Sequence, residues 1–142
     1  RALRIDGVVP QPVSAAVLDA IPEAPAIEPP RIPMAGSPGP PRLPDHPVGT
    51  VLKMARADGG VIDYYVVLAD GLQRIGEVAA DLIRYTDGRT REQIAAVSAD
   101  VVGALPVVTS LPVATFPDSG GVTLAPVVCA QWRPEQGGTA SH

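Results

Sequence analysis

The distribution of proline constrains this chain more than any other feature of its sequence. Seventeen of the 142 residues are proline, and ten of them fall within residues 22–47. Proline lacks a backbone N–H and fixes its φ angle, so neither a helix nor a central strand can continue through such a run. We therefore expect residues 22–47 to be a linker, or an extended strap along a neighbouring surface, which Ile27, Ile32, Met34 and Leu43 could anchor.

The sequence also contains an apparent repeat. In the clearer copy, an apolar run at residues 64–69 meets a turn at Asp70-Gly71, and a short strand and a helical pattern at residues 76–83 follow. A degraded copy at the amino end has its own turn at Asp6-Gly7 before residues 11–21. Aligning Gln11 with Gln73 also places Asp19 on Asp81 and Ile21 on Ile83, which indicates a repeat protein.

The middle of the chain predicts a hairpin covered by a helix. Residues 48–54 fit a strand, and Asp58-Gly59-Gly60 supplies a turn that lets residues 61–68 return antiparallel beside it. In the helix that follows, apolar residues recur at helical spacing and form a stripe that could cover the sheet. The residues of this stripe are Val78, Ala79, Leu82 and Tyr85.

Beyond this unit the patterns are shorter. Thr90 and Gln93 have the spacing of a capping box, which predicts a helix over residues 91–97 that ends near Ser98. Residues 107–113 and 122–132 are two further strand candidates, expected to form a second small sheet.

The predicted fold class is therefore α+β, with repeat modules of antiparallel strands and a covering helix, a proline-rich linker and a small β-rich segment. We divide the chain as follows: a truncated repeat module at residues 1–21, the linker or strap at 22–47, the hairpin and helix module at 48–97, the β-rich segment at 98–134 and a disordered tail at 135–142. Because the chain begins inside a strand-like pattern without an initiator methionine, we expect it to be an internal piece of a longer protein.

Composition argues against several classes of function. The formal net charge is −4, there is no basic cluster, and only 4% of the residues are aromatic. These values do not favour nucleic-acid binding, which needs phosphate-binding and base-stacking surfaces. No stretch approaches the roughly twenty apolar residues that span a bilayer, so any membrane anchor is expected outside this segment.

The sequence predicts no catalytic, cofactor-binding or metal-binding residue. Its two histidines, His46 and His142, lie far apart, and no phosphate-binding glycine loop is present. Aspartates beside glycine are typical of turns, and we assign Asp6, Gly7, Asp70 and Gly71 this structural role. Cys129 is the single cysteine, and it is either a small buried side chain or a disulfide partner for a cysteine elsewhere in the parent protein.

Three of these segments together resemble the EccB family of actinobacterial type VII (ESX) secretion systems. They are the run Tyr-Tyr-Val-Val-Leu-Ala-Asp-Gly-Leu-Gln at residues 64–73, the helix at 79–83 and the run Val-Cys-Ala-Gln-Trp at 128–132. The resemblance covers nearly the whole chain, as the carboxy-terminal portion of the family's extracytoplasmic region.

The resemblance implies a non-catalytic structural subunit on the periplasmic side of the membrane, in a parent protein anchored by one membrane helix. It implies EccC, EccD, EccE, the mycosin protease and further EccB copies as partners, and a disulfide to which Cys129 contributes the carboxy-terminal half. Two alternatives stay open at this point. The chain could be a peptidoglycan-binding module of the cell wall, because the family's repeats look like a phage-lysin subunit, or it could belong to a nucleotide hydrolase.

Overall fold

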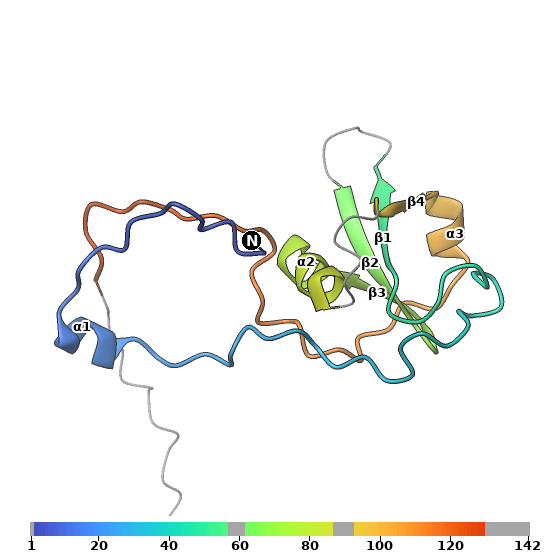
Figure 1. Cartoon of the computed structure of the whole chain (residues 1–142), viewed down its shortest axis with the longest axis horizontal. Helices are drawn as coiled ribbons and strands as arrows, with labels where there is room; N and C mark the ends of the chain where they lie inside the picture. Colours follow the sequence, from blue (N-terminus) through green and yellow to red (C-terminus); the bar gives the residue numbers. More distant parts are fainter. Residues whose placement is uncertain (1, 57–61, 87–92, 130–142) are drawn as a thin grey trace, which may run out of the picture.

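The computed structural model describes residues 2–56, 62–86 and 93–129, and its centre is a four-stranded mixed sheet (Figure 1). The strands are β1 (Val51–Ala55), β2 (Ile62–Leu68), β3 (Gly71–Ile75) and β4 (Ala95–Val97). They lie in the order β3-β2-β1-β4. Three helices accompany them: α1 (Ala15–Ala20), α2 (Glu77–Thr86) and α3 (Ala99–Gly103).

The three longer strands form an antiparallel meander. β1 pairs with β2 in a register that sets Val51 against Val66, and β2 pairs with β3 so that Leu68 faces Gly71 across the turn. β4 joins the other side of β1 in parallel. β-Branched and aromatic residues fill β2, the central strand of the meander, as expected for a strand with both faces covered.

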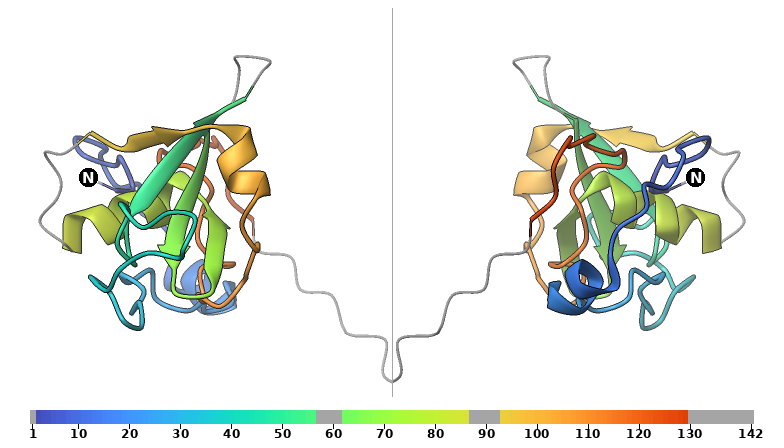
Figure 2. Two further views of the ribbon diagram at one scale, coloured as in Figure 1. Left: turned by 90° about the vertical axis from the view of Figure 1, so that its right-hand side faces the viewer. Right: turned by 90° about the vertical axis from the view of Figure 1, so that its left-hand side faces the viewer.

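Both faces of the sheet are buried. On one face Val66, Ile75 and Ala79 belong to a cluster that includes α2, and on the other Leu52, Tyr65 and Val67 pack with Val102 of α3. The two helices therefore cover opposite faces (Figure 2). Complete burial of Leu52 and Leu72 contributes about 1.5–3 kcal/mol for each side chain.

Part of the proline-rich region packs on this body. Leu43 is buried in the α3 cluster, and Ile32 packs against the α2 cluster. Gly36 donates to the carbonyl of Val48, and the Val48 N–H donates to Ser37, which ties the segment to the start of β1. Two of the four expected anchors are used, whereas Ile27 and Met34 are exposed.

The remaining segments form an arm that extends away from the sheet. Residues 5–21 and 122–129, with α1 at the far end, leave the body where Gly121 donates to the carbonyl of Leu3 (Figure 1). Residues 22–31 return from α1 to the body. We call residues 5–21 and 122–129 the arm.

The structure confirms the α+β class, β1, β2, β3 and the covering helix α2. The stripe predicted on α2 is wrong in two positions, since Leu82 is only partly buried and Tyr85 is exposed. The buried face is formed by Val78, Ala79, Ala80 and Ile83. The helix is rotated relative to the predicted stripe, so that Ala80 and Ile83 pack against the sheet in place of Leu82 and Tyr85.

The second predicted helix is also wrong where it is described. Ala95–Val97 is the parallel edge strand β4, and α3 begins after Ser98, where the helix was expected to end. Hydrogen bonding beside Leu52–Met54 of β1 outweighs the local helical pattern, as tertiary context often does. Residues 87–92, which include Thr90, lie outside the described residues, as does the predicted turn Asp58-Gly59-Gly60.

The small β-rich sheet predicted within residues 98–134 does not form in the described part. Residues 98–129 hold α3 and a single bridge between Val107 and Leu72, with no named strand. Prolines at 106, 112, 117 and 126 remove the backbone donors that a ladder would need. Trp132 and the predicted tail lie outside the described residues.

The amino-terminal copy of the repeat forms its turn at Asp6-Gly7 and its helix, but not its strand. Residues 3–5 are not a strand, because no neighbouring strand pairs with them among the described residues. Ile83 of α2 is buried whereas its counterpart Ile21 is exposed. The two copies therefore do not share a packing arrangement, and the division of the chain into modules stays a prediction.

Candidate functional site

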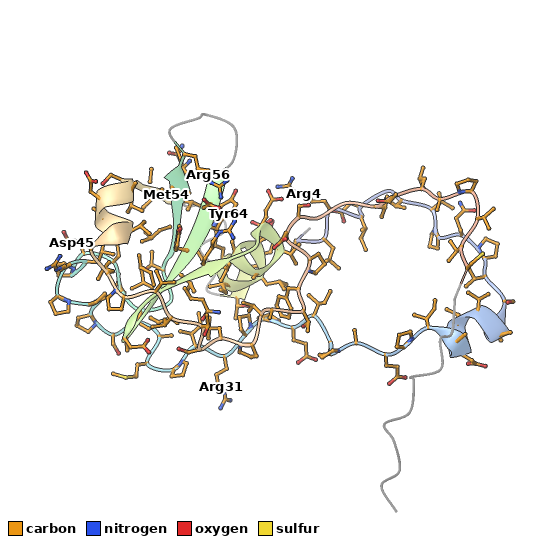
Figure 3. All side chains as sticks on the ribbon, turned by 180° about the vertical axis from the view of Figure 1, so that it is seen from behind. Arg4, Arg31, Asp45, Met54, Arg56 and Tyr64 are labelled. Atoms are coloured by element: carbon orange, nitrogen blue, oxygen red, sulfur yellow. The ribbon has the colours of Figure 1, made fainter. Side chains whose placement is uncertain are left out.

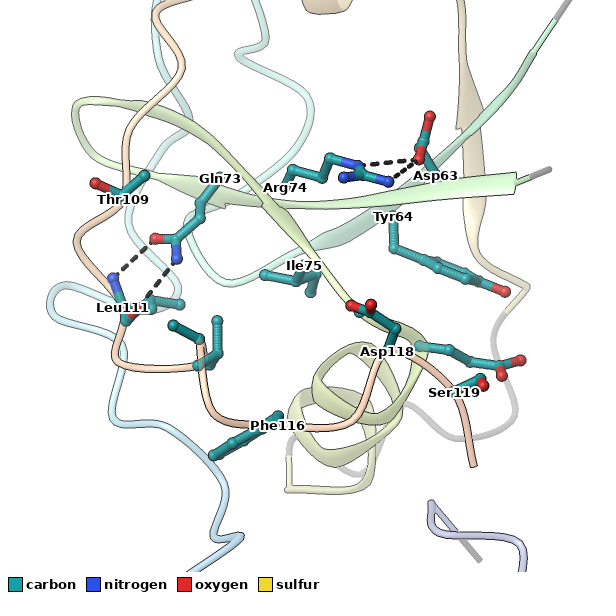
Figure 4. Close-up of a pocket in the computed structure, with 14 residues that line it drawn as sticks. Asp63, Tyr64, Gln73, Arg74, Ile75, Thr109, Leu111, Phe116, Asp118 and Ser119 are labelled. Carbon is teal, nitrogen blue, oxygen red and sulfur yellow. Dashed lines mark hydrogen bonds and ion pairs between the residues drawn. The ribbon is translucent and has the colours of Figure 1, made fainter. Parts of the chain in front are cut away.

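An open groove of about 780 Å³ runs beside β3, the edge strand of the sheet (Figure 4). One wall is the strand, including Arg74 and Ile75, and the other is the irregular segment that contains Thr109, Leu111, Phe116 and Asp118. The two walls meet at both ends of the groove. At one end the Leu72 N–H donates to the carbonyl of Pro106, and the Leu72 carbonyl accepts from the Val108 N–H. At the other end the backbone N–H of Glu77 donates to the backbone carbonyl of Asp118 at 2.7 Å.

Gln73 fixes the irregular segment to the sheet. Its Nε2 donates to the Leu111 carbonyl at 3.0 Å, and the Leu111 N–H donates to its Oε1 at 2.8 Å (Figure 4). The primary amide thus takes the place of a strand neighbour for Leu111. Gln73 is buried, and so is Leu111, which packs in the α2 cluster. Without this side chain the buried N–H of Leu111 would lack a partner, whereas its carbonyl would keep the hydrogen bond from the Val113 N–H.

Three charged side chains form a cluster at the end of the groove nearest the carboxyl end of β1. Asp63 on β2 accepts from Arg56 Nε at 2.7 Å and from Arg74 Nη2 at 2.7 Å. Figure 3 shows Arg56 and Tyr64 at this end of the sheet. Asp63 is only 5% exposed, because the two guanidinium groups cover it. The hydrogen bond from Arg56, followed by that from Arg74, lowers the pKa of Asp63 from 3.8 despite the cost of desolvation.

Replacing Asp63 with asparagine is expected to lower the free energy of unfolding by about 1–2 kcal/mol at pH 7, since the hydrogen-bonded ion pairs with both arginines are weakened. The effect stays modest because both arginines are substantially exposed. A lowered pKa means that the stabilisation is complete above the unfolded-state pKa near 3.8 and is lost as pH falls through the folded-state pKa.

Urea unfolding at pH 7 and at about pH 2 checks this prediction. The difference between wild type and Asp63→Asn should nearly vanish at the lower pH. Asp19→Asn, at an exposed position on α1, is the matched control and should change little at either pH. An equal loss for Asp63→Asn at both pH values would contradict an ionic role for Asp63.

Next to this cluster, Tyr64 lies on the α2 side of β2 and lines the groove. Its partial burial raises its pKa above 10.0, and the charges of Glu77 and Asp81 add to the effect. Glu77 forms an ion pair with Arg4, which joins the first residues of the chain to the start of α2. The Tyr64 hydroxyl therefore stays protonated at neutral pH, and its half-buried ring forms part of the groove wall.

The arm is the second surface of interest, because its apolar side chains are largely exposed. α1 has no buried residue at all, although Ser14 caps it by accepting from the Val17 N–H at 3.3 Å. The exposed apolar residues of the arm are Ile5, Val8, Val9, Val13, Leu18, Ile21, Val122, Leu124, Val127 and Val128. A helix this short is not stable in water without tertiary contacts, and α1 buries no residue.

The residues predicted from the sequence lie apart from one another. Gly7 has a φ of 79° and Asp6 precedes it in a turn, while Asp70 and Gly71 join β2 to β3. Cys129 is exposed at the end of the described arm. Among the described residues, no three His, Cys, Asp or Glu side chains gather where they could hold a metal ion, and no described helix is long and apolar enough to cross a membrane.

The sequence analysis missed the residues that build the groove, namely Gln73, Asp63 and Arg74. A signal was available, since a glutamine stands between apolar residues on a strand whose two faces both need covering. Geometrically, the groove and the arm can bind other chains: the groove offers backbone groups and a mixed polar and apolar lining, and the arm offers apolar side chains.

Comparison with protein families gives a match along the whole chain. The family model described as "Type VII secretion system ESX-1, transport TM domain B" matches residues 1–142. The ESX-3 secretion system ATPase EccB3 of Mycobacterium tuberculosis (strain ATCC 25618 / H37Rv) is 35% identical over 149 residues, which cover 98% of this chain and 28% of that protein. EccB3 of Mycolicibacterium smegmatis is 37% identical over 131 residues, covering 88% and 25%.

Solved structures agree with these matches. The EccB3 dimer from the ESX-3 core complex has a TM-score of 0.68 at 34% identity, covering 84% of this chain and 30% of that one. The periplasmic assembly from the ESX-5 inner membrane complex has a TM-score of 0.59 at 30% identity, covering 77% and 26%. The chain thus spans less than a third of the length of these relatives.

Proposed function

This chain belongs to the EccB family of type VII secretion systems, and we propose that it is a non-catalytic structural segment of the secretion complex, held on the periplasmic side of the membrane. In this role it joins neighbouring parts of the complex and supports protein export without carrying out chemistry. The parent protein, rather than this segment, supplies the membrane anchor.

The exposed arm is the observation that carries this proposal. A capped six-residue helix that buries nothing, joined to extended segments with exposed valines, has too few contacts within the described residues to be stable alone. Contiguous exposed apolar surface on a protein is typical of an interaction site. The arm therefore acts as a surface that other parts of the complex cover.

The solved relatives support both the place and the kind of assembly. One is described as a periplasmic assembly from an inner membrane complex and another as an EccB3 dimer. We propose a second EccB copy as a partner of the parent protein. Contacts with EccC, EccD, EccE and the mycosin protease belong to the same proposal.

The two alternatives gain no support from the described residues. The word ATPase stands in the names of relatives of which this chain matches 28% or less. No phosphate-binding loop occurs in the sequence, and neither the groove nor the arm shows a feature that favours nucleotide or peptidoglycan.

The proposal predicts that charges on the arm disrupt assembly. Changing both Val9 and Val127 to aspartate in the full-length parent should reduce recovery of the protein in the secretion complex at least tenfold. Each valine contributes about 2 kcal/mol when a partner buries it, equivalent to roughly 30-fold in affinity. Co-purification of the complex from cells, normalised to the total amount of the protein, measures the effect.

Val107 provides a matched control on the body of the protein. It is 64% exposed, compared with 74% for Val9 and 73% for Val127, and its bridge to Leu72 uses the backbone. Val107→Asp should assemble like the wild type. Normal assembly of the arm variant, or an equal defect in the control, would contradict a specific role for the arm.

The pairing of Cys129 stays a separate proposal. Its thiol is exposed in the described structure and is the only one in the chain, so a disulfide needs a cysteine elsewhere in the parent protein. Non-reducing peptide mapping of the full-length protein should show Cys129 in a linked peptide. A free thiol at Cys129 in protein isolated from the cell envelope would contradict the disulfide.

A further inference from the structure

Strand β3 has an open backbone edge at Arg74. Val67 and Leu72 lie opposite each other on neighbouring strands, but their backbone N–H and C=O groups point away from each other. Those of Val67 hydrogen-bond with Gly49 and Thr50, whereas those of Leu72 hydrogen-bond with Pro106 and Val108. In an antiparallel ladder this orientation repeats every second residue. The next such pair is Tyr65 and Arg74, so the N–H and C=O of Arg74 also point outward, into the groove.

The described chain leaves this position uncovered. To place a residue beside Arg74, the segment after Val108 would have to continue parallel to β3. Instead, Leu111 hydrogen-bonds with the Gln73 side chain and packs on the α2 face of the sheet. The segment returns to the strand only at Asp118, whose carbonyl accepts from Glu77. No hydrogen bond to the backbone of Arg74 from that segment occurs among the described residues.

The lining of the gap defines what could fill it. Ile75, Val113 and Phe116 present apolar surface, and the carboxylate of Asp118 points toward the end of β3 (Figure 4). The other nearby acidic groups already have partners, since Asp63 binds two arginines and Glu77 binds Arg4. Asp118 is exposed and has no side-chain partner among the described residues, so it is the carboxylate of the groove that is open to a basic group.

We propose that this groove binds an extended peptide segment of a partner protein, which adds to β3 as a short strand beside Arg74 and directs a basic side chain to Asp118. The space between the two closed ends admits roughly three residues of extended chain. Backbone hydrogen bonds to Arg74 supply affinity, while the apolar lining and Asp118 select apolar and basic side chains. The edge already accepts one parallel partner at Leu72, so a continuation uses a pairing that the strand supports.

This inference goes beyond the proposed scaffold role. The arm and the groove share no residue, so a defect in one leaves the other testable. Exposed strand edges pair readily with other chains, and proteins usually cover them. Here the cover of β3 is incomplete and stops at a groove that contains an unpaired carboxylate, which fits a binding site better than a protected edge.

The test uses the full chain, labelled with ¹⁵N, and three acetylated and amidated pentapeptides. They are Thr-Val-Lys-Val-Thr, the same peptide with Glu in place of Lys, and the lysine peptide N-methylated at every residue. We expect the lysine peptide at millimolar concentration to shift the Arg74 amide resonance and to slow its hydrogen exchange. The glutamate peptide should bind at least about tenfold more weakly, and the methylated peptide should not bind.

Two pairs of protein variants identify the contact. Arg74→Pro removes the outward N–H at an edge position that tolerates proline, whereas Arg74→Ala keeps that N–H and equally loses the guanidinium. Binding should disappear in Arg74→Pro and persist in Arg74→Ala. Asp118→Asn should remove the preference for lysine over glutamate, while Asp45→Asn, at an exposed position on the strap, should preserve it.

Several results would overturn the proposal. These are no shift at Arg74 with any peptide, equal binding by Arg74→Pro and Arg74→Ala, or equal binding of the methylated peptide. Self-association of the chain that Arg74→Pro abolishes would identify a second copy as the occupant and would also overturn it. Arg74→Pro and Arg74→Ala both lose the guanidinium group. If that loss unfolds the protein, the NMR spectra of both variants lose their dispersed resonances, which distinguishes a folding defect from a loss of binding.

Discussion

Replacing Gln73 with leucine should lower the free energy of unfolding of the chain by about 2 kcal/mol, the largest loss expected from a single side chain in the groove. Leucine keeps most of the volume but leaves the buried N–H of Leu111 without a partner, while the Leu111 carbonyl keeps only its hydrogen bond from the Val113 N–H. Each unsatisfied buried group costs about 1–3 kcal/mol. Denaturant unfolding followed by circular dichroism measures the loss.

Gln73→Glu is the matched variant, because it keeps the shape and the acceptor but replaces the donor with a carboxylate. At neutral pH it should also be destabilised, since a charged oxygen faces the carbonyl of Leu111. At acid pH the protonated glutamic acid can donate again, so its deficit relative to wild type should shrink. A full-sized deficit for the glutamate variant at every pH, or a neutral effect of leucine, would contradict the role given to Gln73.

Replacing Gly71 with alanine should cost about 3 kcal/mol, because a Cβ at this position has no room. It would lie 2.2 Å from the carbonyl oxygen of Pro106, at a residue whose φ is 157°. The same carbonyl accepts from the Leu72 N–H, so the clash also breaks the bond that starts the cover of β3. Thermal unfolding of the variant should show a clear fall in midpoint.

Gly103→Ala separates this steric effect from the general effect of a larger residue. Gly103 is the last residue of α3, and a Cβ there has no atom within 4 Å. The change should be neutral or stabilising by up to about 1 kcal/mol, because alanine favours the helix. Equal destabilisation at both glycines would show that the approach of Pro106 is not what requires glycine at residue 71.

The meander and its covering helix could be predicted from local sequence, because their signals are local. Alternating and β-branched residues mark β1 and β2, the Asp70-Gly71 pair marks the turn, and apolar spacing marks α2. β4 could not be predicted in the same way. Its three residues carry a helical pattern, and they become a strand only because β1 offers an unpaired edge, which depends on the tertiary fold.

The groove was hidden for a related reason. Gln73 and Asp63 appear in the sequence as ordinary polar residues of a strand. The partners of Asp63 stand only seven and eleven positions away, but no motif marks the pairing. The amide of Gln73 is matched by Leu111, thirty-eight positions later. Only the folded chain shows that these polar groups are buried and paired. The sequence signal was the position of a polar residue within an apolar strand, not any recognisable motif.

The arm shows the opposite situation. Its apolar residues predicted strands and a repeat, but no strand forms where the described residues provide no partner for it. Pro126, which lies inside the strand predicted at residues 122–132, explains part of this result. The exposed valines and isoleucines explain the rest, since their burial depends on surfaces that another part of the complex supplies under the proposed function.

Hydrogen exchange of the arm tests the central claim most directly. The chain alone and the full-length protein in the assembled secretion complex are compared, with amides of β2 as the internal standard. We predict that amides of residues 8–21 and 122–128 exchange at least about tenfold more slowly in the complex, while those of β2 change little. Equal exchange of the arm in both samples, with an intact complex, would show that no partner covers it and would contradict the structural role proposed for this chain.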